Sequence, residues 1–218
     1  MGTYLNTASF NTPDVIVQRE PFPFLIARNT LDEQRKAELR NDFPVYSEAG
    51  YFPYTPSECG SSVNQLIDEI TSPAIADELG AKLGIEQLSQ YPTLVTICRH
   101  LNRRHGGIHT DGKSKVATAL IYMNEEWNGT SDGCLRFLSS ADDVNATVVP
   151  EVAPLFGWFA MFKRADNSYH GHLPYEGERR VIQIAWIINE AERDRKIKRG
   201  SFSRFIKGIF GGLDRKVG

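Results

Sequence analysis

The sequence lacks the features that mark several common classes of protein. Only three of its 218 residues are cysteine, and no two of them form a Cys-x-x-Cys pair. Neither a disulfide framework nor a zinc ribbon is therefore indicated. No uninterrupted apolar run is long enough to cross a bilayer, and residues 1–15 have neither the basic region nor the apolar region of a secretory signal. We expect a reducing, cytoplasmic setting.

The sequence also lacks a strong excess of charge of one sign. Its formal net charge is −2, so composition suggests neither nucleic acid nor an acidic polymer as a partner. Hydrophobic residues make up 41% of the chain, which supplies enough apolar material for a sizeable core. The length suits a single domain. We expect one domain over residues 1–199, followed by an extension over residues 200–218.

The expected extension is basic, although the chain as a whole is slightly acidic. From residue 196 to the end there are seven Lys and Arg residues against a single acidic residue. Apolar residues recur there at the steps of three and one that are typical of a helix, namely Phe202, Phe205, Ile206, Ile209, Phe210 and Leu213. Three hypotheses remain open: docking on the acidic body or on a second copy of the chain as a homo-oligomer, peripheral contact with an anionic membrane, or contact with a partner protein.

The pattern of the chain predicts an α+β fold. Residues 14–18 and 22–28 read as extended, and capping boxes at 30–33 and 62–65, with Ser72-Pro73, mark the starts of three helices. Residues 44–61 read as a loop that overhangs a pocket. Six short strand-like runs then follow, at 93–100, 116–123, 134–138, 146–152, 158–163 and 179–188. Many short strands after a helical region predict a β-sandwich or jelly roll, with the N-terminal helices packed on one sheet.

A metal site is indicated by a histidine and a carboxylate two residues apart. His109 and Asp111 lie just before a predicted strand, and residues i and i+2 of an extended chain point the same way. A third ligand should come from a later strand, where His170 is the candidate and His172 is its rival. Two imidazoles and one carboxylate form the ligand set of non-haem iron(II) oxygenases. The His-x-Asp pattern alone is weak, and its weight comes from the sequence around it.

The surrounding sequence resembles the core of the prolyl-hydroxylase-like 2-oxoglutarate/iron(II) dioxygenases. The residues that carry the resemblance are His109-Thr110-Asp111, the run ALIYMNEEW at 119–127, GCLRF at 133–137, and HGHLP at 170–174 with Arg180 and Trp186 downstream. The resemblance covers residues 93 to 189. It implies a double-stranded β-helix core, Fe(II) held by His109, Asp111 and His170, the co-substrates 2-oxoglutarate and O2, and ascorbate as a candidate reductant. Asp132 stands where the family has the first glycine of a Gly-Gly pair.

The resemblance also implies an arginine that binds the distal carboxylate of 2-oxoglutarate, and here two arginines are adjacent. A guanidinium can neutralise that carboxylate with two parallel hydrogen bonds. Because neighbouring residues of a strand face opposite ways, only one of Arg179 and Arg180 can reach the pocket. Alignment without gaps to Trp186 favours Arg180, whereas counting from Gly177 favours Arg179, and we prefer Arg180. Tyr122 is expected as a second contact to the carboxylate, or else as a core aromatic, with Thr118 beside it.

The substrate is the least determined part of the prediction. Residues expected near the substrate are Arg99, His100, Leu120, Leu135, His172 and Trp186. The main hypothesis is hydroxylation of an unactivated C–H bond in a small molecule, a glycan or a lipid-linked substrate. The alternatives are a peptidyl hydroxylase of the prolyl type and a jelly-roll binding module without catalysis. No recognition element for nucleic acid is visible in the sequence.

Overall fold

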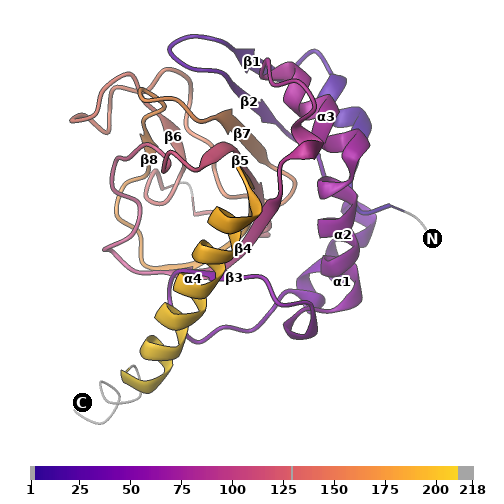
Figure 1. Ribbon diagram of the computed structural model, residues 1–218, viewed down its shortest axis with the longest axis vertical. Helices are drawn as coiled ribbons and strands as arrows, with labels where there is room; N and C mark the ends of the chain where they lie inside the picture. The colour runs from indigo at the N-terminus through magenta and orange to yellow at the C-terminus, as the bar shows by residue number, and fades with distance from the viewer. Residues whose placement is uncertain (1–2, 129, 211–218) are drawn as a thin grey trace.

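The computed structural model describes residues 3–128 and 130–210, with side chains as far as residue 200. The fold is α+β, with a large antiparallel sheet at its centre (Figure 1). The amphipathic stripe expected within residues 200–218 lies outside the described side chains. That hypothesis therefore stays a prediction.

Two antiparallel sheets form the core of the protein. The larger has the strand order β1-β2-β7-β5-β9-β4-β3, and the smaller consists of β6 and β8. Their bounds are β1 Ile16–Gln18, β2 Phe24–Ala27, β3 Tyr51–Pro53, β4 Thr93–Leu101, β5 Lys115–Tyr122, β6 Arg136–Phe137, β7 Phe159–Lys163, β8 His170–Gly171 and β9 Gly177–Ile187. This arrangement confirms the predicted helix-backed jelly-roll class.

Apart from η1, which precedes β1, the helices lie in two parts of the chain, between β2 and β4 and after β9. The α-helices are α1 Lys36–Asp42, α2 Ser61–Thr71, α3 Pro73–Lys82 and α4 Glu190–Phe210, and the 3-10 helices are η1 Thr7–Asn11, η2 Glu33–Arg35, η3 Pro56–Glu58 and η4 Leu88–Gln90. Figure 1 shows α1, α2 and α3 stacked on one side of the large sheet, with β6 and β8 on the other side. The smaller sheet and its loops therefore lie on the face of the large sheet opposite α1, α2 and α3.

The period-two alternation of the strands divides the interior into two apolar clusters. On β5, Ala117, Ala119 and Ile121 belong to the cluster shared with the helices. Leu120 and Tyr122, between and after them, belong to the cluster shared with the smaller sheet. Because side chains alternate between the two faces of a strand, each central strand supplies one residue in two to the side on which β6 and β8 lie.

Several boundaries differ from the predictions for local reasons. Asp32 caps η2, and its carboxylate accepts from the backbone N–H of Gln34. Thr30, the cap that the sequence predicted, is buried, and its hydroxyl donates to the Gly157 carbonyl. In α2, the Asp42 carboxylate accepts from the N–H of Ser62 in place of the predicted capping box. The run 146–152 makes only isolated bridges and is not a strand.

Helix α4 crosses the expected boundary between residues 199 and 200 without a break. Its first half packs on β3, β4 and β9 (Figure 1). Pro53 of β3 lies so close to Gly200 that a Cβ there would come within 2.8 Å of its ring. The division into a domain and an extension stays a prediction. Within the described residues, no helix combines the length and the apolarity needed to cross a membrane.

Candidate metal centre

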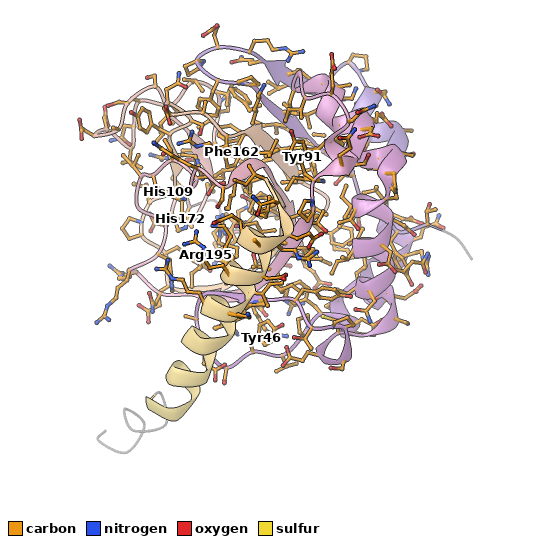
Figure 2. All side chains as sticks on the ribbon, viewed as in Figure 1. Tyr46, Tyr91, His109, Phe162, His172 and Arg195 are labelled. Carbon is orange, nitrogen blue, oxygen red and sulfur yellow. The ribbon has the colours of Figure 1, made fainter. Side chains whose placement is uncertain are left out.

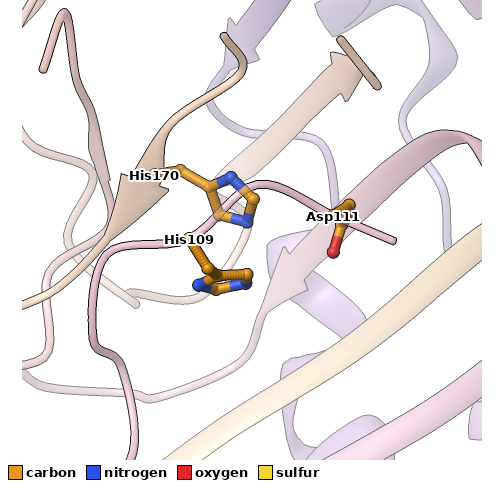
Figure 3. A group of neighbouring side chains, drawn as sticks. All are labelled: His109, Asp111 and His170. Atoms are coloured by element: carbon orange, nitrogen blue, oxygen red, sulfur yellow. The ribbon is translucent and has the colours of Figure 1, made fainter. Parts of the chain in front are cut away.

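Backbone pairing brings the two predicted histidine ligands together. His109 and His170 form an isolated antiparallel bridge, in which each backbone N–H donates to the other residue's carbonyl at 3.0 Å. Their rings lie with centroids 4.3 Å apart, and Asp111 follows two residues after His109 (Figure 3). One ligand atom from each of His109, Asp111 and His170 lies within 4.8 Å of the others. These three residues therefore form a group that can hold one ion.

Each imidazole of the group is oriented by a backbone carbonyl. Nδ1 of His109 lies 2.9 Å from the Gly107 carbonyl oxygen, and Nδ1 of His170 lies 2.9 Å from that of Ser168. A carbonyl only accepts, so Nδ1 carries the proton and Nε2 keeps its lone pair for a metal. Burial also lowers the pKa of His170 to about 4, so its imidazole is neutral at pH 7.

The carboxylate of Asp111 is ionised and held by two donors. Lys115 Nζ lies 2.8 Å from Oδ1, and Thr118 Oγ1 donates to Oδ2 at 2.5 Å. Burial would raise the pKa of Asp111, but Lys115, His170 and these hydrogen bonds outweigh it and lower the pKa to about 2. Two imidazoles and one oriented carboxylate suit Fe(II), whose other coordination positions then stay available to a co-substrate.

Thr118 therefore holds the carboxylate of the candidate ligand Asp111, and the contact with the co-substrate that the sequence predicted for Thr118 stays a prediction. Thr118→Val keeps the shape of this buried side chain and removes its hydroxyl. Partners that orient a ligand typically contribute roughly 10- to 100-fold to metal affinity. We expect a loss of that size in the Fe(II) affinity of Thr118→Val, measured by anaerobic competition with a chelator. Thr118→Ser should retain most of the affinity, and an unchanged affinity in Thr118→Val would contradict this role.

The metal group opens into a cavity of about 320 Å³. Its apolar wall is formed by Leu120, Leu135 and Phe162, and its polar lining by Tyr51, His105, Lys115, Thr118, His172, Arg179 and Gln183. Leu120, Leu135 and His172 thus lie where the sequence placed them. His172 is outside the group of three that could hold the ion, and its Nδ1 lies 2.7 Å from the Leu173 carbonyl oxygen.

The adjacent arginines of β9 face opposite ways, and Arg179, not the preferred Arg180, faces the cavity. Arg179 lines the cavity, and only 2% of it is exposed. Arg180 lies on the helix side, pairs with Glu178 at 2.8 Å and approaches the ring of Phe43. The physical reason is strand parity. Trp186, which guided the alignment to Arg180, belongs to the cluster shared with the helices. Arg180 lies an even number of residues from Trp186 on the same strand, so it also points away from the metal group.

Arg179 is a buried cation held by neutral groups. Its Nε donates to the Gly133 carbonyl at 2.8 Å, Nη1 to the Tyr51 hydroxyl at 3.0 Å and Nη2 to the Tyr122 hydroxyl at 3.3 Å. Arg179 takes part in none of the ion pairs between described residues. A buried charge without a counter-charge is costly. The cavity is therefore electrostatically prepared for an anion at this end.

Three predicted substrate contacts lie elsewhere. The Arg99 side chain donates to the Pro44 carbonyl and pairs with Glu178 at 3.2 Å, away from the cavity. His100, next to it on β4, is absent from the cavity lining, and Trp186 is fully buried on the helix side of the sheet. The structure thus separates these three residues from the metal group.

The polar cavity residues that the sequence reasoning missed include Gln183, Lys115 and Tyr51. Gln183 lies four residues after Arg179 on the same face of β9, so strand parity would have found it once Arg179 was chosen. Lys115 stands four residues after Asp111, and the local sequence gives no sign of their ion pair. Tyr51 reaches the cavity from β3, within the stretch predicted as an overhanging loop, and only the tertiary fold reveals its role.

Comparison with known proteins agrees with this site. Residues 87–188 match the family model described as the 2OG-Fe(II) oxygenase superfamily. A prolyl-4-hydroxylase from Pseudomonas putida is similar in structure, with 18% identity, a TM-score of 0.52, and coverage of 77% of this chain and 93% of the other. A viral collagen prolyl hydroxylase from Paramecium bursaria Chlorella virus-1 has 15% identity, a TM-score of 0.54, and coverage of 77% and 90%. No curated protein matches the sequence.

The matched segment contains all three members of the metal group. The chain is therefore a non-haem Fe(II) oxygenase. More specifically, it is a 2-oxoglutarate-dependent dioxygenase, and its fold is similar to that of prolyl hydroxylases. Its cofactor is Fe(II), and its co-substrate is 2-oxoglutarate. The alternative of a binding module without catalysis is set aside, because the matched family model is that of an oxygenase.

Proposed function

We propose that the enzyme hydroxylates an unactivated C–H bond in a side chain of a peptide, with Fe(II) on His109, Asp111 and His170 and 2-oxoglutarate on Arg179. The observation that carries the co-substrate assignment is the buried Arg179, which has no counter-charge among the described residues. A dicarboxylate that reaches the metal with one end would supply that charge with the other.

The residues around the centre have separable tasks in this proposal. Arg179 receives the distal carboxylate of the co-substrate through a fork of two N–H donors. Tyr122 and Tyr51 hold that fork in place through their hydroxyls. When bound, Fe(II) and 2-oxoglutarate would supply the oxidising chemistry together with O2: one oxygen atom converts C–H to C–OH, and the other enters succinate as 2-oxoglutarate loses CO2. Leu120, Leu135 and Phe162 keep the cavity wall apolar, which limits the access of water to the reacting carbon.

The size of the cavity favours a peptide over the small molecule, glycan or lipid-linked substrate of our main sequence hypothesis. Ligand pockets typically measure roughly 300–1,000 Å³, and this cavity of about 320 Å³ must also take the co-substrate. The space that remains suits one side chain, with the rest of the substrate lying outside the mouth. Both similar structures named above are prolyl hydroxylases, and this likeness of fold makes proline the first residue to test.

The proposal predicts peptide-dependent succinate formation. Protein purified without oxygen and loaded with Fe(II) and 2-oxoglutarate should form succinate faster in air when mixed with a proline-containing peptide library. The library should gain 16 Da in mass on the reacting residue, because one oxygen atom is inserted. Succinate formation stimulated only by sugars or other small molecules, with every peptide unmodified, would restore the main sequence hypothesis.

A further inference from the structure

Two lysines from distant parts of the chain meet beside the metal group. Lys115 begins β5, lines the cavity and contacts Asp111 Oδ1 at 2.8 Å. Lys196 comes from α4, and its Nζ lies 3.9 Å from the position that a Cβ on Gly112 would take. Gly112 follows Asp111 in the chain, and its carbonyl accepts from the backbone N–H of Lys115 at 2.9 Å. The two ammonium groups therefore flank the same short turn at the edge of the cavity.

The charge of Lys196 is not neutralised by the described residues around it. Lys196 forms none of the ion pairs between described side chains, whereas its neighbours Arg193 and Arg195 are paired within α4. Partial burial, then Lys115 and then Arg195 lower the pKa of Lys196, and the carboxylates of Asp111 and Glu192, which raise it, offset this only in part. The first half of α4 thus presents a positive charge beside Gly112, at the edge of the cavity. On this part of the helix, Figure 2 labels Arg195, the residue before Lys196.

The charge of Lys115 is matched only while the metal group is empty. Asp111 is the one carboxylate among the described residues that line the cavity. In the loaded site, the charges of Fe(II) and Arg179 are balanced by those of Asp111 and the 2-oxoglutarate dianion. Nothing in that set is left to neutralise Lys115 and Lys196. The loaded enzyme therefore offers two uncompensated positive charges where the substrate must enter.

We propose that the substrate is an acidic peptide, and that Lys115 and Lys196 together bind a carboxylate side chain next to the residue that is hydroxylated. The inference rests on the proposed peptidyl function and adds its selectivity. An aspartate or glutamate on the substrate supplies the missing charge at the edge of the cavity. Paired lysines suit such a group because each ammonium is a compact charge on a flexible stem.

The test uses four synthetic proline peptides that differ only in the residues flanking proline, which are glutamate, glutamine, lysine or alanine. Binding is followed by fluorescence anisotropy on the full chain, loaded with 2-oxoglutarate and with Mn(II) in place of Fe(II) so that no turnover occurs. Turnover of the same peptides is followed by mass spectrometry on the Fe(II) enzyme. We expect the glutamate peptide to bind roughly tenfold more tightly than the lysine peptide at low salt, with the preference shrinking as salt is added.

The matched variants are Lys196→Glu and Lys198→Glu. Both reverse one charge on α4, but residue 198 is exposed and lies about 200° around the helix from residue 196. Lys196→Glu should lower the ratio of glutamate-peptide to lysine-peptide affinity by roughly tenfold, which removes or inverts the preference. Lys198→Glu should leave this ratio unchanged. The ratio within each variant is compared, so a general loss of activity or folding does not imitate the result.

The outcomes separate this inference from the function on which it rests. Peptides that are hydroxylated without regard to their flanking charge would overturn the acidic selectivity and leave the peptidyl function standing. An equal change of the ratio in the two variants would also overturn it, because the effect would then belong to the charge of the whole helix. If no peptide is bound or modified, the peptidyl function itself fails, and the acidic selectivity fails with it.

Discussion

Asp111→Ala is expected to abolish succinate formation, and the loss should arise from the metal site and not from unfolding. Asp111 is the only carboxylate of the metal group. Removing a partner that merely orients a ligand already costs roughly 10- to 100-fold in affinity or activity. Removing the ligand itself should therefore lower Fe(II) affinity by more than about 100-fold. Oxygen-dependent conversion of 2-oxoglutarate to succinate, with and without peptide, measures the loss of activity.

Two controls make the Asp111→Ala result specific. Asp142→Ala removes an exposed carboxylate from a loop away from the cavity, and it should keep the wild-type rate. The absorption band that Fe(II) and 2-oxoglutarate give together without oxygen should be present in Asp142→Ala and absent in Asp111→Ala. Folding is checked by circular dichroism, because the removal of Asp111 also leaves Lys115 without its carboxylate. An Asp111→Ala protein that retains the band would refute the ligand assignment.

Two members of the candidate metal group could be predicted from the sequence because their signal is local. His109 and Asp111 are two residues apart, so the geometry of an extended chain is enough to point them at one ion. His170 lies about 60 residues later in the sequence. It was predicted from the order of motifs in the family that the sequence resembles, because local spacing could not identify it. The pairing of His109 with His170 through two backbone hydrogen bonds is the physical reason that this order works.

The sequence alone could not decide which of Arg179 and Arg180 faces the cavity, because a shift of one residue exchanges the two faces of a strand. Strand β9 runs without interruption from Gly177 to Ile187, so the face of one residue fixes the face of all. Trp186 was a misleading guide, since a large aromatic fits the helix side of the sheet as well as it fits a pocket wall. Tyr51 and Lys196 could not be predicted because contacts between distant segments place them at the site.

Arg179→Met is expected to remove 2-oxoglutarate binding, while Arg180→Met should preserve it. Each substitution deletes one positive charge from β9 and keeps an unbranched side chain. The two variants therefore differ only in the face of the strand from which the charge is removed. A charge-assisted hydrogen bond contributes about 1.5–3 kcal/mol, and the guanidinium offers two to a carboxylate. Loss of both predicts a rise of roughly 100-fold or more in the concentration of 2-oxoglutarate needed for half-maximal succinate formation.

Thermal unfolding gives a second measurement that does not depend on turnover. A ligand present at about 100 times its Kd stabilises the folded protein by about 2.7 kcal/mol. The wild type and Arg180→Met, each loaded with Mn(II), should therefore gain melting temperature on addition of 2-oxoglutarate, and Arg179→Met should gain little. Arg179→Lys is expected to fall between them, because it keeps the charge but loses the two-pronged contact. The opposite pattern, with binding lost in Arg180→Met and kept in Arg179→Met, would show that 2-oxoglutarate does not occupy the cavity described above.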